Sequence, residues 1–218
     1  MAKLRAIEKS INITKSKKHG LSRTVKLLIR IVSKDSIKRM EKYTLYGDDN
    51  FDIEKLAQAL HYIVSKVGSE PNVGKTFLYK MLYFCDFDHF EKSQTFFIGE
   101  RYRKIAHGPA PEHFDAAIRQ LIRAGKIEVI KTKSGPYDRN KYTAIKEPTM
   151  DKLNANELFL IDNEIGRFRG MSATQISEYS HGDMPWKATE DNKYIDYRLA
   201  FYRTPIYSVE AGANGTVY

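Results

Sequence analysis

The stretch KMLYFCDFDHF (residues 80–90) decides the fold, because it is aromatic and apolar along almost its whole length. In a helix over about residues 75–91, its aromatic side chains point in several directions and its other apolar side chains share a face. That face holds Leu78, Met81, Leu82, Cys85 and His89. A helix that is apolar nearly all round is typical of a domain centre, so we predict a buried central helix.

The polar residues of this stretch raise the question of a metal site. Cys85, Asp88 and His89 stand at positions i, i+3 and i+4, which is close enough in a helix to ligate one ion. Structural zinc takes four ligands, usually from paired Cys or His residues. Because the sequence contains no CxxC and no HxxxH, we predict no metal site.

Sequence patterns typical of enzymes are also missing. There is no GxxxxGK[ST], no GxGxxG and no GxSxG. A lone cysteine in a buried helix is a poor nucleophile, because burial raises the pKa of its thiol. We therefore predict no catalytic residues, no cofactor and no enzymatic activity. In this interpretation Asp86 and Asp88 lie on a polar side of the helix or pair it with another helix, and Lys75 and Lys80, which are nearby in sequence, offset their charges.

The positive charge of the chain is concentrated near its N-terminus. Residues 1–40 contain 12 Lys and Arg against two Asp and Glu, a net of +10, which leaves 24 positive and 25 negative residues in 41–218, a net of −1. Such a basic arm can attract nucleic acid phosphates or an acidic protein, or it can simply be a solvated extension. Its candidate partner-binding residues are Lys17, Lys18, Arg23, Lys26, Arg30 and Arg39.

Composition and hydropathy predict a folded cytoplasmic protein. The chain of 218 residues is 42% hydrophobic, which is enough for a packed core. No apolar run reaches the roughly 18 residues of a membrane span, and the basic N-terminus lacks the apolar stretch of a signal peptide. A single cysteine excludes an internal disulfide framework.

Hydrophobic periodicity and end signals predict a mainly α fold: a compact helical domain with a small β-hairpin in a winged-helix-like unit, plus a basic N-terminal extension. SRTVKLLIRIVSK (22–34) fits a helix through Val25, Leu28, Ile29 and Val32, with a strand as the alternative. The turn-like YGDDN (46–50) marks a boundary. We predict an extension over 1–45 that is a candidate for partner choice, a helical domain over 46–205 and a flexible tail over 206–218.

Within the predicted domain, a helix from Ile53 is capped by Gly68, and another begins at Pro111 and ends at Gly125. Two strands, about 127–132 and 141–145, flank a Gly-Pro turn. Capping boxes start two further helices. We expect SHGDMPWKAT (180–189) to be a loop and NKYIDYRLAFYR (192–203) to be the last helix. The capping pairs are Asn154 with Glu157 and Ser172 with Gln175.

Several of these segments together resemble the Panacea, or SocA-like, domain family over about residues 50–203. The aromatic helix matches its K-LLY-D--H pattern, the next segment its G--Y-----GP-P pattern, and 180–186 its S-H----PW pattern. The matching residues are Lys80, Leu82, Tyr83, Asp86, His89, Gly99, Tyr102, His107, Gly108, Pro109, Pro111, Ser180, His181, Pro185 and Trp186. The basic residues 1–45 have no counterpart in this pattern.

The resemblance implies an antitoxin of a two-gene toxin–antitoxin system of bacteria and phages, which neutralises a cognate protein toxin, commonly one that blocks translation, by direct contact. Arg101 and Arg103 are then further candidate partner-binding residues, since Arg and Tyr are frequent interface anchors. Tyr102 is expected in the core, His107-Gly108-Pro109 in a loop of fixed shape, and Trp186 and His181 in packing of the C-terminal loop.

The alternative prediction is a DNA-binding transcriptional regulator. GMSATQISEYS (170–180) looks like a helix-turn-helix turn, and 111–145 like a winged helix. The helix at 172–180 contains Glu178 but no Lys or Arg, so the hairpin is the better basic feature. Its cations are Lys131, Lys133, Arg139 and Lys141. An antitoxin can also bind its own promoter, so the two functions are compatible.

Overall fold

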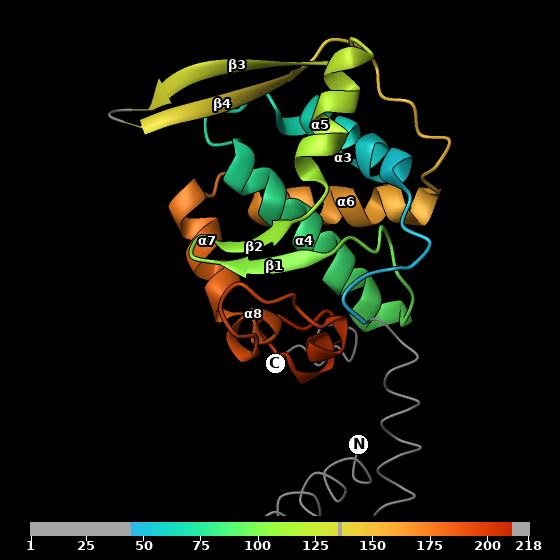
Figure 1. Ribbon diagram of the computed structural model, residues 1–218, viewed down its shortest axis with the longest axis vertical. Helices are drawn as coiled ribbons and strands as arrows, with labels where there is room; N and C mark the ends of the chain where they lie inside the picture. Colours follow the sequence, from blue (N-terminus) through green and yellow to red (C-terminus); the bar gives the residue numbers. More distant parts are fainter. Residues whose placement is uncertain (1–44, 135–136, 211–218) are drawn as a thin grey trace, which may run out of the picture. The chain divides into compact units, whose positions relative to one another are not determined.

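The computed structural model describes residues 45–134 and 137–210, which contain seven helices and two antiparallel hairpins (Figure 1). The prediction of a mainly α protein is confirmed, whereas the winged-helix assignment stays a prediction. The helix or strand expected at 22–34 and nearly all of the basic extension lie outside the described residues. Among the described residues, no helix is long and apolar enough to cross a membrane.

The elements follow one another as helices interrupted by the two hairpins. In chain order they are α3 (Ile53–Val67), α4 (Lys75–Ser93), β1 (Tyr102–Ile105), β2 (Gly108–Pro111), α5 (Phe114–Arg123), β3 (Ile127–Ser134), β4 (Tyr137–Ala144), α6 (Ala155–Phe168), α7 (Ala173–Gly182), α8 (Met184–Ala188) and the 3-10 helix η1 (Tyr197–Tyr202).

Helix α4 is the buried centre of this domain, as its aromatic sequence predicts. It contacts β2, α6, α7 and η1, and its apolar side chains from Phe77 to Phe87 are completely covered except for the partly buried Tyr79. Aromatic rings surround it on several sides: Phe87 stacks on Tyr197 of η1 with ring centroids 4.2 Å apart. Figure 1 shows α6 and the β1–β2 hairpin on different sides of α4.

Helix α5 and the β3–β4 hairpin form one unit next to α3. The apolar residues Phe114, Ala117, Ile118 and Leu121 of α5 are buried, whereas Ile122 is 44% exposed. β3 pairs with β4 from Ile127 opposite Ala144 to Ser134 opposite Tyr137, so both strands are longer than predicted. Figure 1 shows this hairpin extending past the helices at one end of the domain.

The β1–β2 hairpin was not predicted as strands, because Gly and Pro are depleted in strands and β2 is GPAP. Pro111 ends β2 and does not start α5, which begins at Phe114. A two-stranded hairpin tolerates these prolines because each strand has a free edge. β1 also contacts the later chain through a bridge between Arg103 and Tyr194.

The C-terminal part is more helical at one place and less helical at another than predicted. The expected loop at 180–189 consists of the end of α7 and the short helix α8, with Asp183 as the cap between them and Pro185 in the first turn of α8. Only Tyr197–Tyr202 of the expected last helix is helical, and it is a 3-10 helix. Both predicted capping boxes are confirmed, at Asn154 and at Ser172.

Gly68 caps α3 as predicted, but its φ of −61° lies in the ordinary helical region. The glycine is needed for space, because a Cβ at this position would lie 2.5 Å from the carbonyl oxygens of both Tyr142 and Val64. This close approach places β4 against the end of α3.

We expect Gly68→Ala to lower the free energy of unfolding by about 1–3 kcal/mol, because the added methyl group meets backbone that must move. The matched control is Gly166→Ala in α6, where an added Cβ meets no atom within 4 Å and removal of glycine should stabilise by about 0.5–1 kcal/mol. Urea denaturation of both variants measures the difference. Equal effects would contradict the close-approach explanation.

Candidate functional site

Asp86 of α4 is a buried carboxylate that fixes the segment following the helix. Its Oδ1 accepts hydrogen bonds from the backbone N–H groups of Ile98 (2.7 Å) and Gly99 (3.0 Å), and its Oδ2 accepts one from the Tyr102 hydroxyl (2.8 Å). Burial raises the pKa of Asp86, and these hydrogen bonds oppose the rise. Asp86 therefore does not lie on a polar side of α4, and Tyr102 lies in the core.

Asp88 is buried as well, and its partner is an arginine from the far end of the domain. The Arg203 guanidinium, which has no exposed side-chain surface, donates to Asp88 Oδ1 (2.6 Å) and to Glu91 Oε2 (3.0 Å). It also donates to Asp183 Oδ2 (2.7 Å), which accepts a second hydrogen bond from the Tyr83 hydroxyl (2.9 Å). The expectation that Lys75 and Lys80 offset the α4 carboxylates was wrong.

A second arginine extends this buried network to α6 and α7. Arg167 donates to Asp88 Oδ2 (2.8 Å), to Glu164 Oε2 (3.2 Å) and to the hydroxyl of Tyr179 (2.6 Å). Burial, reinforced by the nearby Asp88, raises the pKa of Glu164 to about 8. The raised pKa favours the protonated form of Glu164, which reduces the negative charge that two arginines must balance.

The beginning of the expected tail contacts the same network. Ser208 Oγ donates to Glu91 Oε1 (2.5 Å), and the Ile206 carbonyl accepts a hydrogen bond from Tyr179 (3.1 Å). Residues 206–209 are thus tied to α4 and α7, and residues 211–218 lie outside the described part of the chain.

Lys80 joins α4 to the second hairpin strand and to α7. Its Nζ is buried and donates to the carbonyl of Pro109 (3.0 Å), and burial lowers its pKa to about 7. The neighbouring Gly108 has φ of +94°, and a Cβ there would lie 2.4 Å from Ser180 Oγ and 2.6 Å from Lys80 Cε. Three segments of the family pattern therefore meet at this point.

His181 and Trp186 pack together beside this point. Their rings stack with centroids 4.2 Å apart, and Lys104 Nζ lies 4.1 Å from the centre of the Trp186 ring. His181 Nε2 and Trp186 Nε1 are buried and have no hydrogen-bond partner among the described residues. His107 is exposed in the β1–β2 turn, and its carbonyl accepts a hydrogen bond from Ser177 (3.2 Å).

The residues that suggested a metal site have other contacts. Cys85 is completely buried, which raises the pKa of its thiol, and Asp88 binds two arginines. His89 Nδ1 lies 2.9 Å from the carbonyl oxygen of Thr95 and 3.1 Å from Ser93 Oγ. Within residues 45–134 and 137–210, no group of three His, Cys, Asp or Glu residues is placed to hold a metal ion.

The candidate partner-binding residues differ in their surroundings. Arg101 is exposed, and its guanidinium has no partner among the described residues. The guanidinium of Arg103 lies 4.4 Å from the centre of the Tyr194 ring and donates to its hydroxyl (2.8 Å) and to the Asn192 carbonyl (3.0 Å). The six candidates of the arm lie outside the described residues, so partner binding stays a prediction for all eight.

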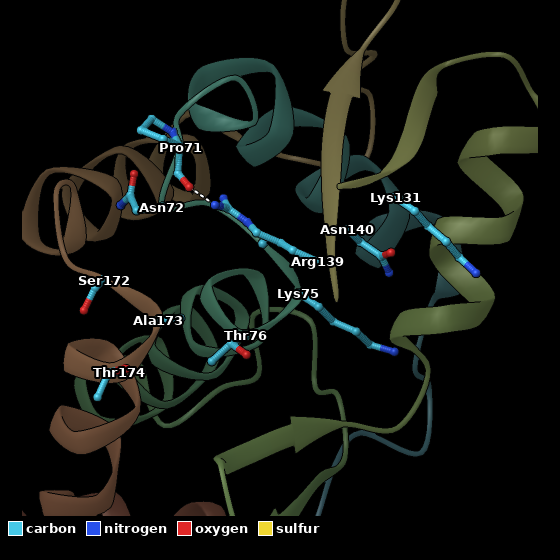
Figure 2. A pocket seen from close by; sticks show the side chains of 11 residues that line it. Pro71, Asn72, Lys75, Thr76, Lys131, Arg139, Asn140, Ser172, Ala173 and Thr174 are labelled. Carbon is cyan, nitrogen blue, oxygen red and sulfur yellow. Dashed lines mark hydrogen bonds between the residues drawn. The ribbon is translucent and has the colours of Figure 1, made fainter. Parts of the chain in front are cut away.

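A basic groove lies away from this buried network, and Figure 2 shows its lining. It has a volume of about 890 Å³ and lies among the start of α4, the start of α7 and the β3–β4 hairpin. We call it the α4–hairpin groove. Its lining residues are Pro71, Asn72, Gly74, Lys75, Thr76, Lys131, Arg139, Asn140, Ser172, Ala173 and Thr174.

Sequence reasoning did not single out Arg167, Asp183, Glu164 or Arg203, although they complete the buried network. Arg203 is 115 positions away from Asp88, and no periodicity relates residues at such a distance. The family pattern singled out Lys80 and Tyr83, and the only other expectation for Lys80 was that it offsets the charges of Asp86 and Asp88.

Comparison with known families gives one match. The family model described as "Antitoxin SocA-like, Panacea domain" matches residues 78–187, which is 110 of the 218 residues. The match includes Lys80, Asp86 and the His181–Trp186 stack but not Arg203. No curated protein and no solved structure is significantly similar to the chain.

We expect Arg203→Met to lower the free energy of unfolding by about 3–5 kcal/mol, because it leaves Asp88 and Asp183 buried without their main counter-charge. The control is Arg198→Met, which removes the partially exposed pair with Asp196 and should cost at most about 1 kcal/mol. Urea denaturation measures both. A loss below 1 kcal/mol in Arg203→Met would show that the buried network adds little stability.

Lys80 should make stability depend on pH. Its pKa is about 7 in the folded chain and near 10.4 in an unfolded one, so the unfolded state binds more protons between these values. Its contribution is therefore complete above about pH 10.4 and is lost as the pH falls through 7. We expect the free energy of unfolding to rise by ~1–2 kcal/mol more in the wild type than in Lys80→Met between pH 7 and 9.

Urea denaturation at pH 7, 8 and 9 measures this difference, and the contribution of Glu164 cancels because both proteins contain it. Lys92→Met, at an exposed position of the same helix, serves as the control and should follow the wild type. Parallel pH profiles for the wild type and Lys80→Met would contradict an uncharged, buried Lys80.

Proposed function

The chain belongs to the family of SocA-like antitoxins with a Panacea domain, and from this we propose that it neutralises a cognate toxin by direct protein–protein contact. The observation that carries this proposal is the family match over residues 78–187. The finer elements of the proposal, which are direct contact and a toxin that blocks translation, come from the resemblance described above.

The buried polar groups support a role in binding over a role in chemistry. The carboxylates of Asp86 and Asp88 are occupied by backbone amides, a tyrosine hydroxyl and two arginines of the same domain. A general acid or base must reach the proton of a substrate, and these groups are completely buried. We infer that the motif residues shape a rigid domain whose surface meets the partner.

Partner choice is proposed for the basic arm. Its net charge of +10 over residues 1–40 can attract an acidic face of the toxin and raise the rate of association. Arg101 on the surface of the domain can add a contact of the same sign, since its guanidinium has no partner within the part that the structure describes. Because the arm lies outside the family pattern, it can differ between members that meet different toxins.

The test is rescue of growth. We expect the product of an adjacent small gene to arrest growth when expressed alone, and co-expression of the full chain to restore growth. The triple variant Lys17→Glu/Lys18→Glu/Lys26→Glu should rescue at least 10-fold less well, because it reverses charges in the arm. The matched control reverses three exposed lysines of the domain, Lys92→Glu/Lys133→Glu/Lys146→Glu.

Failure of the wild type to rescue from its own adjacent gene would contradict the antitoxin proposal. Full rescue by the arm variant would contradict the role of the arm alone. Binding of the purified chain to promoter duplex, with a steep dependence on salt and no binding to the toxin, would favour the DNA-binding alternative.

A further inference from the structure

The α4–hairpin groove is the part of the described surface where cationic side chains from different segments line one concave site. Lys75 belongs to α4, while Lys131 and Arg139 belong to β3 and β4. None of its described lining residues is acidic. Figure 2 shows Lys75 and Lys131 extending in the same direction with Asn140 between them in this view, whereas Arg139 points toward Pro71.

Two of the three cations are held in place by the protein itself. Arg139 donates to the carbonyls of Pro71 and Val73, the second at 2.8 Å, so its guanidinium braces the hairpin against the loop before α4. Lys75 Nζ lies 2.7 Å from Oδ1 of Asp115, and Asp115 itself does not line the groove. Positive charges fixed in advance lose little conformational entropy when an anion binds.

The third cation, Lys131, is free to meet a ligand. Its side chain is exposed, and its ammonium has no hydrogen bond or ion pair with the side chains described for residues 45–133 and 139–210. Thr76 and Asn140 supply further hydrogen-bonding groups from the neighbouring walls. Helix α4 also begins here, with Gly74 as a cap that has no side-chain hydrogen bond and with no acidic residue in its first turn. Its amide end therefore adds to the positive potential of the groove.

We propose that the α4–hairpin groove binds a short acidic peptide segment of the partner protein, with its carboxylates placed between Lys75 and Lys131. The proposal rests on the proposed antitoxin function and names the part of the domain that contacts the toxin. A volume of about 890 Å³ holds a few side chains and not a folded domain. The other lining residues are uncharged, which suits contact with the peptide backbone between the carboxylates.

The borders of the groove favour a short anion over a nucleic acid strand. Asp115, 60% exposed, lies beside Lys75. A phosphate backbone that continued past Lys75 would meet this carboxylate, and like charges at close range repel. A peptide with two or three adjacent carboxylates ends before it reaches Asp115.

The experiment measures peptide affinity in the full chain by fluorescence anisotropy. The probe is a fluorescein-labelled peptide Gly-Glu-Glu-Glu-Gly, with Gly-Gln-Gln-Gln-Gly as the neutral comparison. All proteins carry Lys17→Glu/Lys18→Glu/Lys26→Glu, so that these arm cations do not contribute. We expect Lys131→Glu to weaken binding at least 10-fold. Lys133→Glu, at an exposed position two residues along the same strand but outside the groove, should weaken it less than threefold.

The other outcomes overturn the proposal. Equal weakening by Lys131→Glu and Lys133→Glu would show attraction to general charge. Tighter binding of a 12-base-pair duplex than of the glutamate peptide, with the same loss in Lys131→Glu, would assign the groove to nucleic acid. Thermal unfolding checks that both variants fold, which we expect because both lysines are exposed.

Growth rescue separates this proposal from the antitoxin proposal. With the arm intact, Lys131→Glu should rescue at least 10-fold less well than Lys133→Glu. If the wild type rescues and Lys131→Glu rescues equally well, the groove does not contact the toxin and the antitoxin proposal stands. If the wild type itself does not rescue, the antitoxin proposal fails, and peptide affinity alone then decides whether the groove binds acidic segments.

Discussion

The pairing of one buried arginine with carboxylates from two distant segments holds this domain together. Arg203, at the end of η1, binds Asp88 of α4 and Asp183 between α7 and α8. A buried charge costs several kcal/mol to remove from water, and it is tolerated only when its partners are close and well oriented. The C-terminal third of the domain must therefore close onto α4 in one arrangement, because another arrangement would leave these charges unpaired.

The same constraint explains why the family pattern contains polar residues in an aromatic helix. Asp86 holds the backbone of residues 98 and 99, Lys80 holds Pro109, and Tyr83 holds Asp183. Each of these side chains positions a different following segment. In the sequence, a cysteine, two aspartates and a histidine within five positions look like a catalytic site. In the structure these residues pack in the core or bind neighbouring segments.

A rigid interior leaves recognition to the surface. The proposed function uses two regions with different charge: the sequence of the arm carries a high net charge, and the α4–hairpin groove carries a few charges in a fixed arrangement. High net charge accelerates encounter with an acidic partner, whereas fixed charges select among acidic segments by geometry. In the proposed function, the arm accounts for rapid association and the groove for selectivity.

Sequence alone determined those features that depend on neighbouring residues: the buried helix α4, both capping boxes, the β3–β4 hairpin and the family pattern. The prediction was wrong about β1–β2, because Gly and Pro are rare in strands and β2 contains both. It was also wrong about α8, because Pro185 was expected in a loop but lies in the first turn of this helix. Only the tertiary structure decided the partners of Asp86 and Asp88 and the groove beside Lys75. Those depend on segments separated by up to 115 positions, and local pattern carries no information about which distant charge will meet which.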